Sequence, residues 1–433
     1  MQTAQDLASR SEAQAGLSAL VRTYAVWIIA AGLLVALPLV FDSGTSLTKM
    51  SLMCIMVVFS LSYNMLLGQT GMLSFGHAVY YGLAGFMAIH ALRFLGVPGM
   101  PVPLPLVPLV GAAMGLACAV VFGWISTRRS GTAFAMISLG LGELVAASAL
   151  ILRSFFGGEE GVSADRSRLL PFAGLDFGAQ LQVYYLIAAW TFVCVVAMFA
   201  VTQTPFGRIA NAVRENPERA EFVGYSTHIV RFISFCLAGT FAGVAGAMAA
   251  INFEIMNALS VSGAQSGVVL LMTYIGGVGH FLGPILGAVL ITALQISLSD
   301  FTGAWMLYFG LLFILVVMYL PGGLAGLIML HAPVLRAQRF GVLVPSYLLL
   351  SGPALLTLAG AAGLIELAHH RLVKAAMDGT AMRLMGVSFD SAAPLPWLLA
   401  VLLLVLGLLL ARVAFRAVRG AWSEVNAGLR QRS

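Results

Sequence analysis

The chain has little charge. Only 9% of its 433 residues are charged and 60% are hydrophobic, with a mean hydropathy of +0.96. Soluble domains carry roughly 25% charged residues, so this composition excludes an ordinary soluble domain. We predict an all-α, polytopic integral membrane protein.

Lysine is almost absent, and so are several enzyme signatures. Neither Lys49 nor Lys374 lies in a G-x-x-x-x-G-K-[ST] context, so we expect no P-loop and no ATP or other cofactor bound by this chain. No H-E-x-x-H motif occurs, and the four cysteines have no paired spacing. The segment 366–370, with Glu366, His369 and His370, could place three metal ligands on one helix face, but a polar helix at the membrane edge explains it at least as well. We therefore predict no metal site and no catalytic residue.

Long apolar stretches recur along the chain. A bilayer core about 30 Å thick needs roughly 20 apolar residues per helix. We predict spans near 21–41, 47–66, 77–95, 103–125, 131–152, 181–202, 229–252, 265–279, 282–299, 304–321, 343–365 and 394–415. About ten transmembrane or re-entrant helices form a core within 21–330. Residues 1–20 are a polar N-terminal segment, and 331–433 are an appended two-helix module with a basic tail.

The distribution of lysine and arginine predicts the orientation. If the chain starts in the cytoplasm, the inner side receives 15 of these residues and the outer side 8. Both termini and the loop 204–228 are then cytoplasmic. The net charge of +6 is a topology signal. Arginines scattered over many loops do not form a nucleic-acid footprint, so no nucleic-acid partner is expected.

Two glycine-rich breaks interrupt the apolar pattern, GQTGMLSFGH at 68–77 and GGVGHFLG at 276–283. Paired interruptions in two parts of a transporter indicate a translocation pathway. Close helix packing through small residues is the alternative, and the two roles are compatible. The candidate pathway or gate residues in the breaks are Gly68, Gly71, Ser74, Gly76, His77, Gly276, Gly277, Gly279 and Gly283.

Three polar residues lie in or at the end of predicted spans. They are Asn64, Glu143 and Glu254. Ionisable residues within a membrane are costly and indicate function. A carboxylate there could bind substrate, carry a proton or accept hydrogen bonds from a neighbouring helix. Asn64 and Glu143 join the candidate pathway residues. The outer loop 154–180 is either a surface for a partner or substrate, or a solvated spacer.

The segment 204–228, TPFGRIANAVRENPERAEFVGYSTH, is a polar insert between two apolar runs. It must face water and can meet a soluble partner. Pro217 suits an early helical position and Gly224 can end a helix.

With this insert, an ordered set of segments resembles the inner-membrane permeases of bacterial branched-chain amino acid ABC transporters, the LivM type. The set consists of LGQTGMLSFGHAVYYGLAGF (67–86), GTAFAMISLGLGELV (131–145), TPFGRIANAVRENPERAEFVGYS (204–226), AGTFAGVAGAMAA (238–250), IGGVGHFLGPILGAVL (275–290) and LVVMYLPGGLAGL (315–327). The resemblance covers about residues 45–328, so 331–433 exceed it.

The resemblance implies a transport subunit in the bacterial inner membrane. The segment 207–224 would be the cytoplasmic coupling helix that docks on an ATP-binding subunit, with Gly207, Arg208, Arg214, Glu215, Ala220 and Gly224 as the matching residues. Its partners would be ABC ATP-binding subunits, which use the ATP, a second permease subunit, and a periplasmic solute-binding protein. Its substrate would be a branched-chain amino acid or a related small polar solute. The run RAEFVGY departs from the family's alanine-rich pattern and leaves the choice of ATPase open.

An ion-coupled secondary transporter or channel without an ATPase is the alternative. It would need charges within the membrane, which Glu143 and Glu254 could supply.

Overall fold

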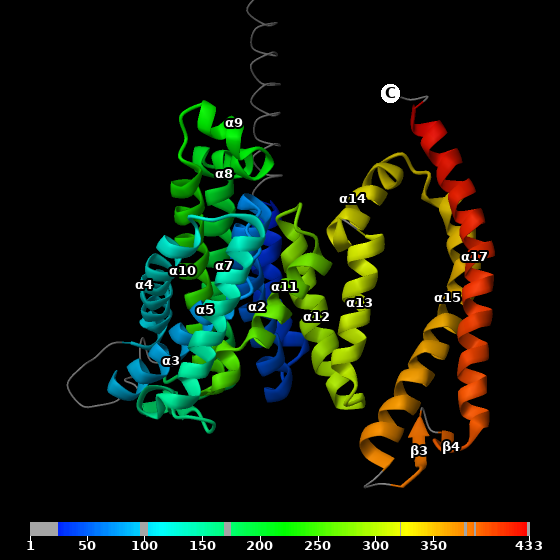
Figure 1. Cartoon of the computed structure of the whole chain (residues 1–433), viewed down its shortest axis with the longest axis horizontal. Helices are drawn as coiled ribbons and strands as arrows, with labels where there is room; N and C mark the ends of the chain where they lie inside the picture. Colours follow the sequence, from blue (N-terminus) through cyan, green and yellow to red (C-terminus); the bar gives the residue numbers. More distant parts are fainter. Residues whose placement is uncertain are drawn as a thin grey trace, which may run out of the picture. The chain divides into compact units, whose positions relative to one another are not determined.

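The computed structural model describes residues 25–95, 103–168, 175–320, 322–375, 379–384 and 387–430. The predicted N-terminal segment 1–20 lies outside these residues. The chain divides into two compact units, Met1–Ala293 and Leu294–Ser433 (Figure 1). This boundary precedes the one expected at 330/331, and the role of the extension stays a prediction.

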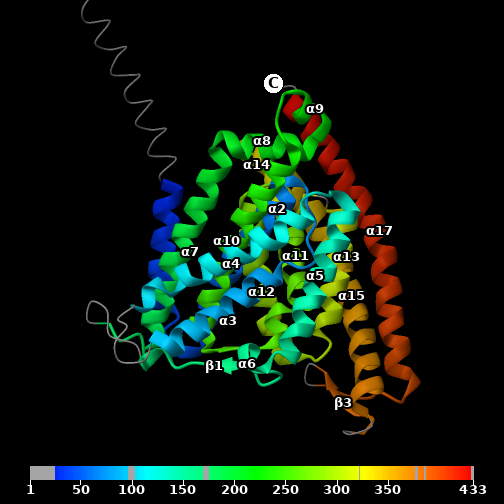
Figure 2. The same cartoon turned by 60° about the vertical axis from the view of Figure 1, so that its left-hand side comes forward.

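The first unit is built from helices that occupy the predicted spans. They are a helix at Ala25–Val40, α2 (Gly44–Thr70), α3 (Ala78–Leu95), α4 (Val107–Ser126), α5 (Gly131–Ile151), α7 (Gln180–Gln203), α10 (Thr227–Phe253), α11 (Gly263–Gly276) and α12 (Leu282–Phe301), which runs into the second unit. Shorter elements are η1 (Leu104–Leu106), α6 (Arg153–Phe156), β1 (Val162–Ser163), η2 (Arg166–Arg168), α8 (Pro205–Glu215), α9 (Pro217–Phe222), β2 (Ile255–Met256) and η3 (Ala258–Val261). Figure 2 shows α8 and α9 at one end of this unit and β1 with α6 at the other.

The core of the first unit is α10, which packs on α2, α3 and α4. Glycines at four-residue spacing bring α4 and α10 together: Gly111 and Gly115 in α4 face Gly239 and Gly243 in α10. A Cβ atom on Gly243 would meet the carbonyl oxygen of Gly111 and lie 3.0 Å from the Cα of Gly115. Without a hydrophobic force between helices in lipid, such close backbone contact is what holds them together.

The second unit contains α13 (Trp305–Tyr319), α14 (Gly323–Arg336), α15 (Phe340–His369) and α17 (Pro394–Arg430). The π-helix His370–Lys374 ends α15, and the antiparallel strands β3 (Ala381–Leu384) and β4 (Val387–Asp390) follow it. Figure 1 shows α15 and α17 side by side as a hairpin. Gly360 and Gly407 lie where the two backbones approach most closely.

Eight helices in the described ranges are long and apolar enough to cross a membrane, or nine if α13 and α14 are counted as one. The all-α, polytopic prediction is confirmed. One helical detail differs. Residues 323–336, which lie in none of the predicted spans, form the helix α14, and the basic C-terminal tail continues α17 without a break.

The close packing of α4 and α10 can be tested with Gly243→Ala. The added methyl group requires the α4 backbone to shift, and overpacking of this kind costs about 1–3 kcal/mol. We expect a lower midpoint of thermal unfolding in detergent. Gly140→Ala in α5 is the matched control, because no atom lies within 4 Å of its Cβ position. Equal stability of the two variants would contradict the packing argument.

Candidate functional site

The first glycine-rich break lies between α2 and α3, and other helices satisfy its backbone. The Phe75 amide donates to Ser138 Oγ of α5 at 3.0 Å, and the Ala78 amide donates to Ser266 Oγ of α11 at 3.0 Å. Tyr63 Oη donates to the Ser74 carbonyl at 3.0 Å. Non-helical backbone is tolerated in a membrane only when its polar groups find such partners.

Glycine 76 lets this break approach α5. A Cβ atom on Gly76 would meet the Ser138 carbonyl oxygen, and one on Gly142 of α5 would lie 3.2 Å from the Cα of Gly76. Gly71 has φ +70° and ends α2, with its amide bonded to the Leu67 carbonyl. A left-handed residue at the end of a helix is most often glycine. These glycines fix the shape of the break, whatever else they do.

The polar candidates of the break are buried. His77 is fully buried and its Nε2 lies 2.9 Å from Ser62 Oγ. His77 Nδ1, Ser74 Oγ and Asn64 Oδ1 have no hydrogen-bond partner. Buried polar atoms without partners are costly and often mark function. In this conformation none of the three side chains reaches a surface, and their role in the pathway stays a prediction.

The second break joins α11 to α12 as a tight hairpin. A Cβ atom on Gly276 would meet the Gly283 carbonyl oxygen, and one on Gly283 would meet that of Gly277. Gly277 has φ +111°, whereas Gly279 is exposed and has no neighbour within 4 Å of its Cβ position. Gly276 and Gly283 thus serve close packing here and Gly277 supplies a positive φ, which leaves a further gating role open.

The two breaks meet in space. The carbonyl oxygen of Val278, in the second break, lies 3.0 Å from the Cβ position of Gly68 near the end of α2. A larger residue at position 68 would also collide with the Asn64 side chain. The sequence indicated two interruptions far apart in the chain, and the structure shows that they form one junction.

The polar insert 204–228 folds as two helices where one was expected. Pro217 has no amide hydrogen and disfavours a helical conformation at the preceding residue, so α8 ends at Glu215. Asn216 is extended and caps α9 by accepting from the Arg219 amide at 2.9 Å. Gly224 has φ +94° just after α9, as expected for a terminating glycine.

The helix α8 is held against the membrane helices by its apolar face. Ala210, Val213 and Ala220 of the insert pack with Val230 of α10. Gly207 lies at the tight turn from α7, where a Cβ atom would come within 2.7 Å of the Val201 carbonyl oxygen. The insert 204–228, called the lever below, is therefore attached to α2, α7 and α10.

Arg214 connects this lever to the junction of the breaks. Its Nη1 donates to the carbonyl oxygen of Gly68, and its Cγ lies 3.1 Å from the Cβ position of Gly71. The last carbonyls of a helix have no partner within the helix and carry partial negative charge. A guanidinium group is well suited to cap them. Arg214 therefore caps α2, although its side chain stays exposed to solvent.

The outward face of the insert combines charge with exposed apolar side chains. Arg208 and Glu215 are exposed on α8. At the end of α9, Phe222 is 90% exposed and Val223 is 72% exposed. With Tyr225, which is 44% exposed, these side chains form an exposed apolar patch beside the charged residues. Phe222 was not predicted as a candidate, because a single phenylalanine barely changes the mean hydropathy of a polar loop.

Glu143 does not join the junction. It is exposed on α5, and its Oε1 lies 3.1 Å from the Cβ position of Gly263, the first residue of α11. A carboxylate is favoured beside a helix N-terminus. Its assignment to the pathway stays a prediction.

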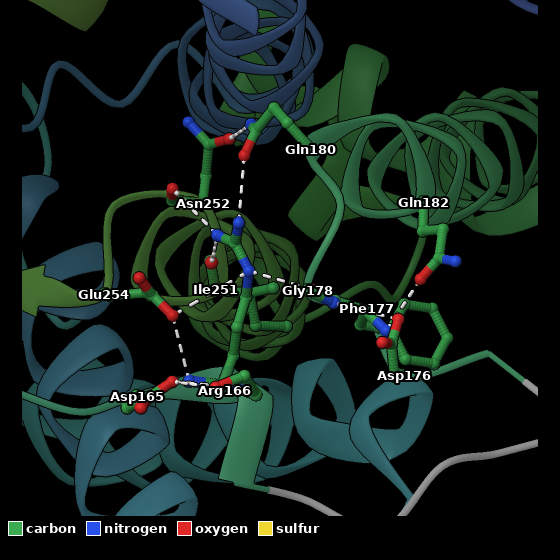
Figure 3. Close-up of polar contacts among 11 residues, drawn as sticks. Asp165, Arg166, Asp176, Phe177, Gly178, Gln180, Gln182, Ile251, Asn252 and Glu254 are labelled. Carbon is green, nitrogen blue, oxygen red and sulfur yellow. Dashed lines mark hydrogen bonds and ion pairs between the residues drawn. The ribbon is translucent and has the colours of Figure 1, made fainter.

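Glu254 was expected inside a span, and that expectation is wrong. It follows α10 as a C-cap residue with φ +57°, and its Oε1 accepts from the Arg166 amide at 2.9 Å. Figure 3 shows the Arg166 guanidinium reaching across the end of α10. It donates to the carbonyl of Ile251 at 3.0 Å and to Gln180 Oε1 at 3.0 Å.

These bonds tie the predicted outer loop to the helices. β1 pairs with β2, and the Arg93 side chain of α3 donates to the Ser163 carbonyl at 2.7 Å. Of the loop 154–180, residues 169–174 lie outside the described part. The rest is a structured cap at the end of the unit opposite α8 and α9, so it is not a solvated spacer.

The described residues contain no group of three or more His, Cys, Asp or Glu side chains placed to hold a metal ion. In the sequence cluster 366–370, Glu366 accepts from Tyr308 Oη at 3.0 Å and His370 Nδ1 lies 3.1 Å from Ser391 Oγ.

The apolar helices, the paired breaks and the lever attached to them define a membrane transport permease. Residues 46–320 match the family described as branched-chain amino acid transport system / permease component. Because the match covers more than half of the chain, the chain belongs to this family. The matched region ends before α14.

Several named relatives agree. The chain is 26% identical to the high-affinity branched-chain amino acid transport system permease protein LivM of Escherichia coli K12, over 67% of this chain and 72% of the relative. It is 23% identical to BraD of Pseudomonas aeruginosa, a permease protein of the same kind of system, over 62% and 91%. It is 24% identical to the probable branched-chain amino acid transport permease protein LivH of Methanocaldococcus jannaschii, over 61% and 84%. No solved structure matches.

The cap at the end of α10 yields a prediction. Arg166→Gln removes most donors to the α10 carbonyls and leaves Glu254 without its cation. We expect amide hydrogen exchange at 162–166 and 251–256 to speed up by about 10-fold or more, as follows from a loss of about 1.5–3 kcal/mol per hydrogen bond to a charged group. Arg153→Gln is the control, because Arg153 is an exposed arginine at the start of α6, directly before the loop. Unchanged exchange in Arg166→Gln would show that the cap does not hold the loop.

Proposed function

We propose that this chain is the permease subunit of an ATP-driven ABC importer for branched-chain amino acids or related small polar solutes. The family and the named relatives support the class of substrate. The observation that carries the ATP-driven mechanism is Arg214, which joins the water-exposed lever to the junction of both breaks.

In this proposal the outward face of α8 and α9 docks on an ABC ATP-binding subunit in the cytoplasm. Arg208 and Glu215 on α8 are exposed, and so is the apolar Phe222 at the end of α9; an aromatic side chain together with charged residues is typical of protein interfaces. ATP binds to and is hydrolysed by that partner. The orientation follows the arginine distribution, with both termini and the lever on the cytoplasmic side of the bacterial inner membrane.

The transport step follows from the contacts of Arg214. When the ATPase subunits close, they move α8, and Arg214 carries the displacement to the carbonyl end of α2. Val278 packs on that same end, so the second break moves with the first. Two rigid helices on either side of flexible breaks can alternate access to a central path by such rocking. A second permease subunit completes the path, and a periplasmic solute-binding protein delivers the substrate to the capped outer loop.

The ion-coupled alternative loses support. Of the two carboxylates that it would use, Glu254 lies beyond the end of α10 and is 3.8 Å from the Arg166 Nε. Only Glu143 then remains within a span.

The class of transporter is tested by purifying the tagged chain from native membranes in mild detergent. We expect an ATP-binding subunit and a second permease to be recovered with it. Phe222→Ser removes a central aromatic anchor, which at a hot spot costs about 2 kcal/mol or more, so recovery of the ATPase should fall about 30-fold at limiting concentration. Recovery of the wild-type chain alone, with uptake that follows the proton gradient, would reject the importer.

The transmission step is tested in the reconstituted transporter. Arg214→Gln should leave ATPase recovery unchanged while uptake per ATP hydrolysed falls about 10-fold or more, since a charged hydrogen bond of about 1.5–3 kcal/mol is lost. Arg214→Lys keeps the charge and should retain part of the uptake. Arg208→Gln, on the outward face, should instead weaken recovery of the ATPase. If Arg214→Gln only weakens recovery, Arg214 acts at the interface and not within the permease.

A further inference from the structure

The C-terminal helix α17 is longer than a membrane is thick. Its 37 residues span about 55 Å at about 1.5 Å per residue, against about 30 Å for the hydrocarbon core. The uncharged stretch 394–411 accounts for about 27 Å of this length. Arg412 therefore lies at the edge of the hydrocarbon, and the following turns pass through the headgroup layer, which is about 5–7 Å thick on each side.

Three exposed arginines form a stripe where α17 leaves the hydrocarbon. Arg412, Arg416 and Arg419 are spaced by four and three residues, so they share one face of the helix. The same face continues into the membrane as exposed apolar side chains, with Val405 47% exposed, Leu408 51% and Leu409 55%. A single helix face thus changes from apolar to basic along its length, which matches the acyl chains and the headgroup of a phospholipid.

The opposite face of α17 is fixed in place, so the stripe is held outward. Val425 is fully buried in a cluster with Val334 of α14 and Leu343 of α15. Trp422 Nε1 donates to Tyr347 Oη at 3.0 Å, and His331 Nε2 lies 2.8 Å from the same oxygen. The C-terminal part of α17 is therefore packed on the junction of α14 and α15, called the elbow below. It cannot rotate freely.

In the part of the chain that the structure describes, no ion pair involves the arginines of the stripe. Within 394–430 the one acidic residue is Glu424, and no ion pair links it to the stripe among the described residues. Arg419 lies over the Phe415 ring with its Cζ 4.9 Å from the centroid. This contact orients the guanidinium group and leaves its charge uncompensated. Arg336 of α14 is exposed as well and adds to the positive charge of the elbow.

We propose that the arginine stripe Arg412–Arg416–Arg419 binds the headgroup of an anionic phospholipid, whose acyl chains lie along Val405, Leu408 and Leu409. The stripe anchors the α14–α17 extension to anionic lipid in the leaflet that it reaches. An acidic protein surface would fit the charges, but it would not explain why the stripe begins at the hydrocarbon edge and continues as an apolar face. The site lies beyond the residues that match the permease family.

Native mass spectrometry of the purified full chain, titrated with phosphatidylglycerol or phosphatidylcholine, tests the proposal. A basic residue near an anionic surface is worth about 1 kcal/mol, or about 5-fold in affinity. Arg412→Gln/Arg416→Gln should therefore bind phosphatidylglycerol about 25-fold more weakly, with little change for phosphatidylcholine. The matched control is Arg128→Gln/Arg129→Gln, which removes two exposed arginines from the α4–α5 turn.

Three outcomes would overturn the proposal. Equal losses in the two double variants would mean that only net charge matters. Unchanged phosphatidylglycerol affinity in Arg412→Gln/Arg416→Gln would remove the site. Unchanged lipid affinity with poorer recovery of the ATP-binding subunit would assign the stripe to a protein partner. Glycerol phosphate, which lacks acyl chains, should compete no better than its ionic strength explains, and strong competition would reduce the site to a phosphate site.

Discussion

A membrane helix that stops inside the protein must have its free backbone groups satisfied there, and the first unit is organised around this constraint. At the first break, Ser138 of α5 accepts a hydrogen bond from the Phe75 amide, and Ser266 of α11 accepts one from the Ala78 amide. At the end of α2, Arg214 donates to the carbonyl of Gly68. The partners come from three different segments, so the backbone of the break is satisfied only where those segments pack around it.

In the proposed mechanism, the same constraint makes the break a point of transmission. A continuous helix would spread a push from α8 along its whole hydrogen-bonded length. An interrupted helix has an end whose carbonyl groups need hydrogen-bond partners from other segments. Here the partner is Arg214, a side chain of the lever. Since Val278 also packs at that end, the proposed mechanism couples both breaks to the lever without a separate linkage. The C-terminal end of α10 is capped in a similar way, because the Arg166 side chain donates to the carbonyl oxygen of Ile251.

Much of the fold follows from the sequence because its signals are local. Apolar length placed a helix in every predicted span, and glycine composition indicated both breaks. The pairing of Gly68 with Val278 was not predictable, because contact between distant segments leaves no trace in one sequence. Ser138 and Ser266 were not predicted. No sequence pattern shows whether a serine in an apolar helix accepts a hydrogen bond from the backbone of another segment. Glu254 was misplaced because hydropathy cannot detect the left-handed cap that ends α10.

The elbow of the extension is packed differently from the core, although glycines also bring α15 and α17 together. In the core, glycines bring helices into backbone contact, as where Gly243 meets Gly111. At the elbow of the extension, large side chains make the contact, with Trp422, Tyr347 and His331 joined by hydrogen bonds. Such a junction of amphipathic aromatic groups suits the wet edge of a bilayer, where one end of each ring is apolar and the other hydrated. Packing on the opposite face fixes α17 at that depth. This packing therefore sets the depth at which Arg412 meets the headgroups.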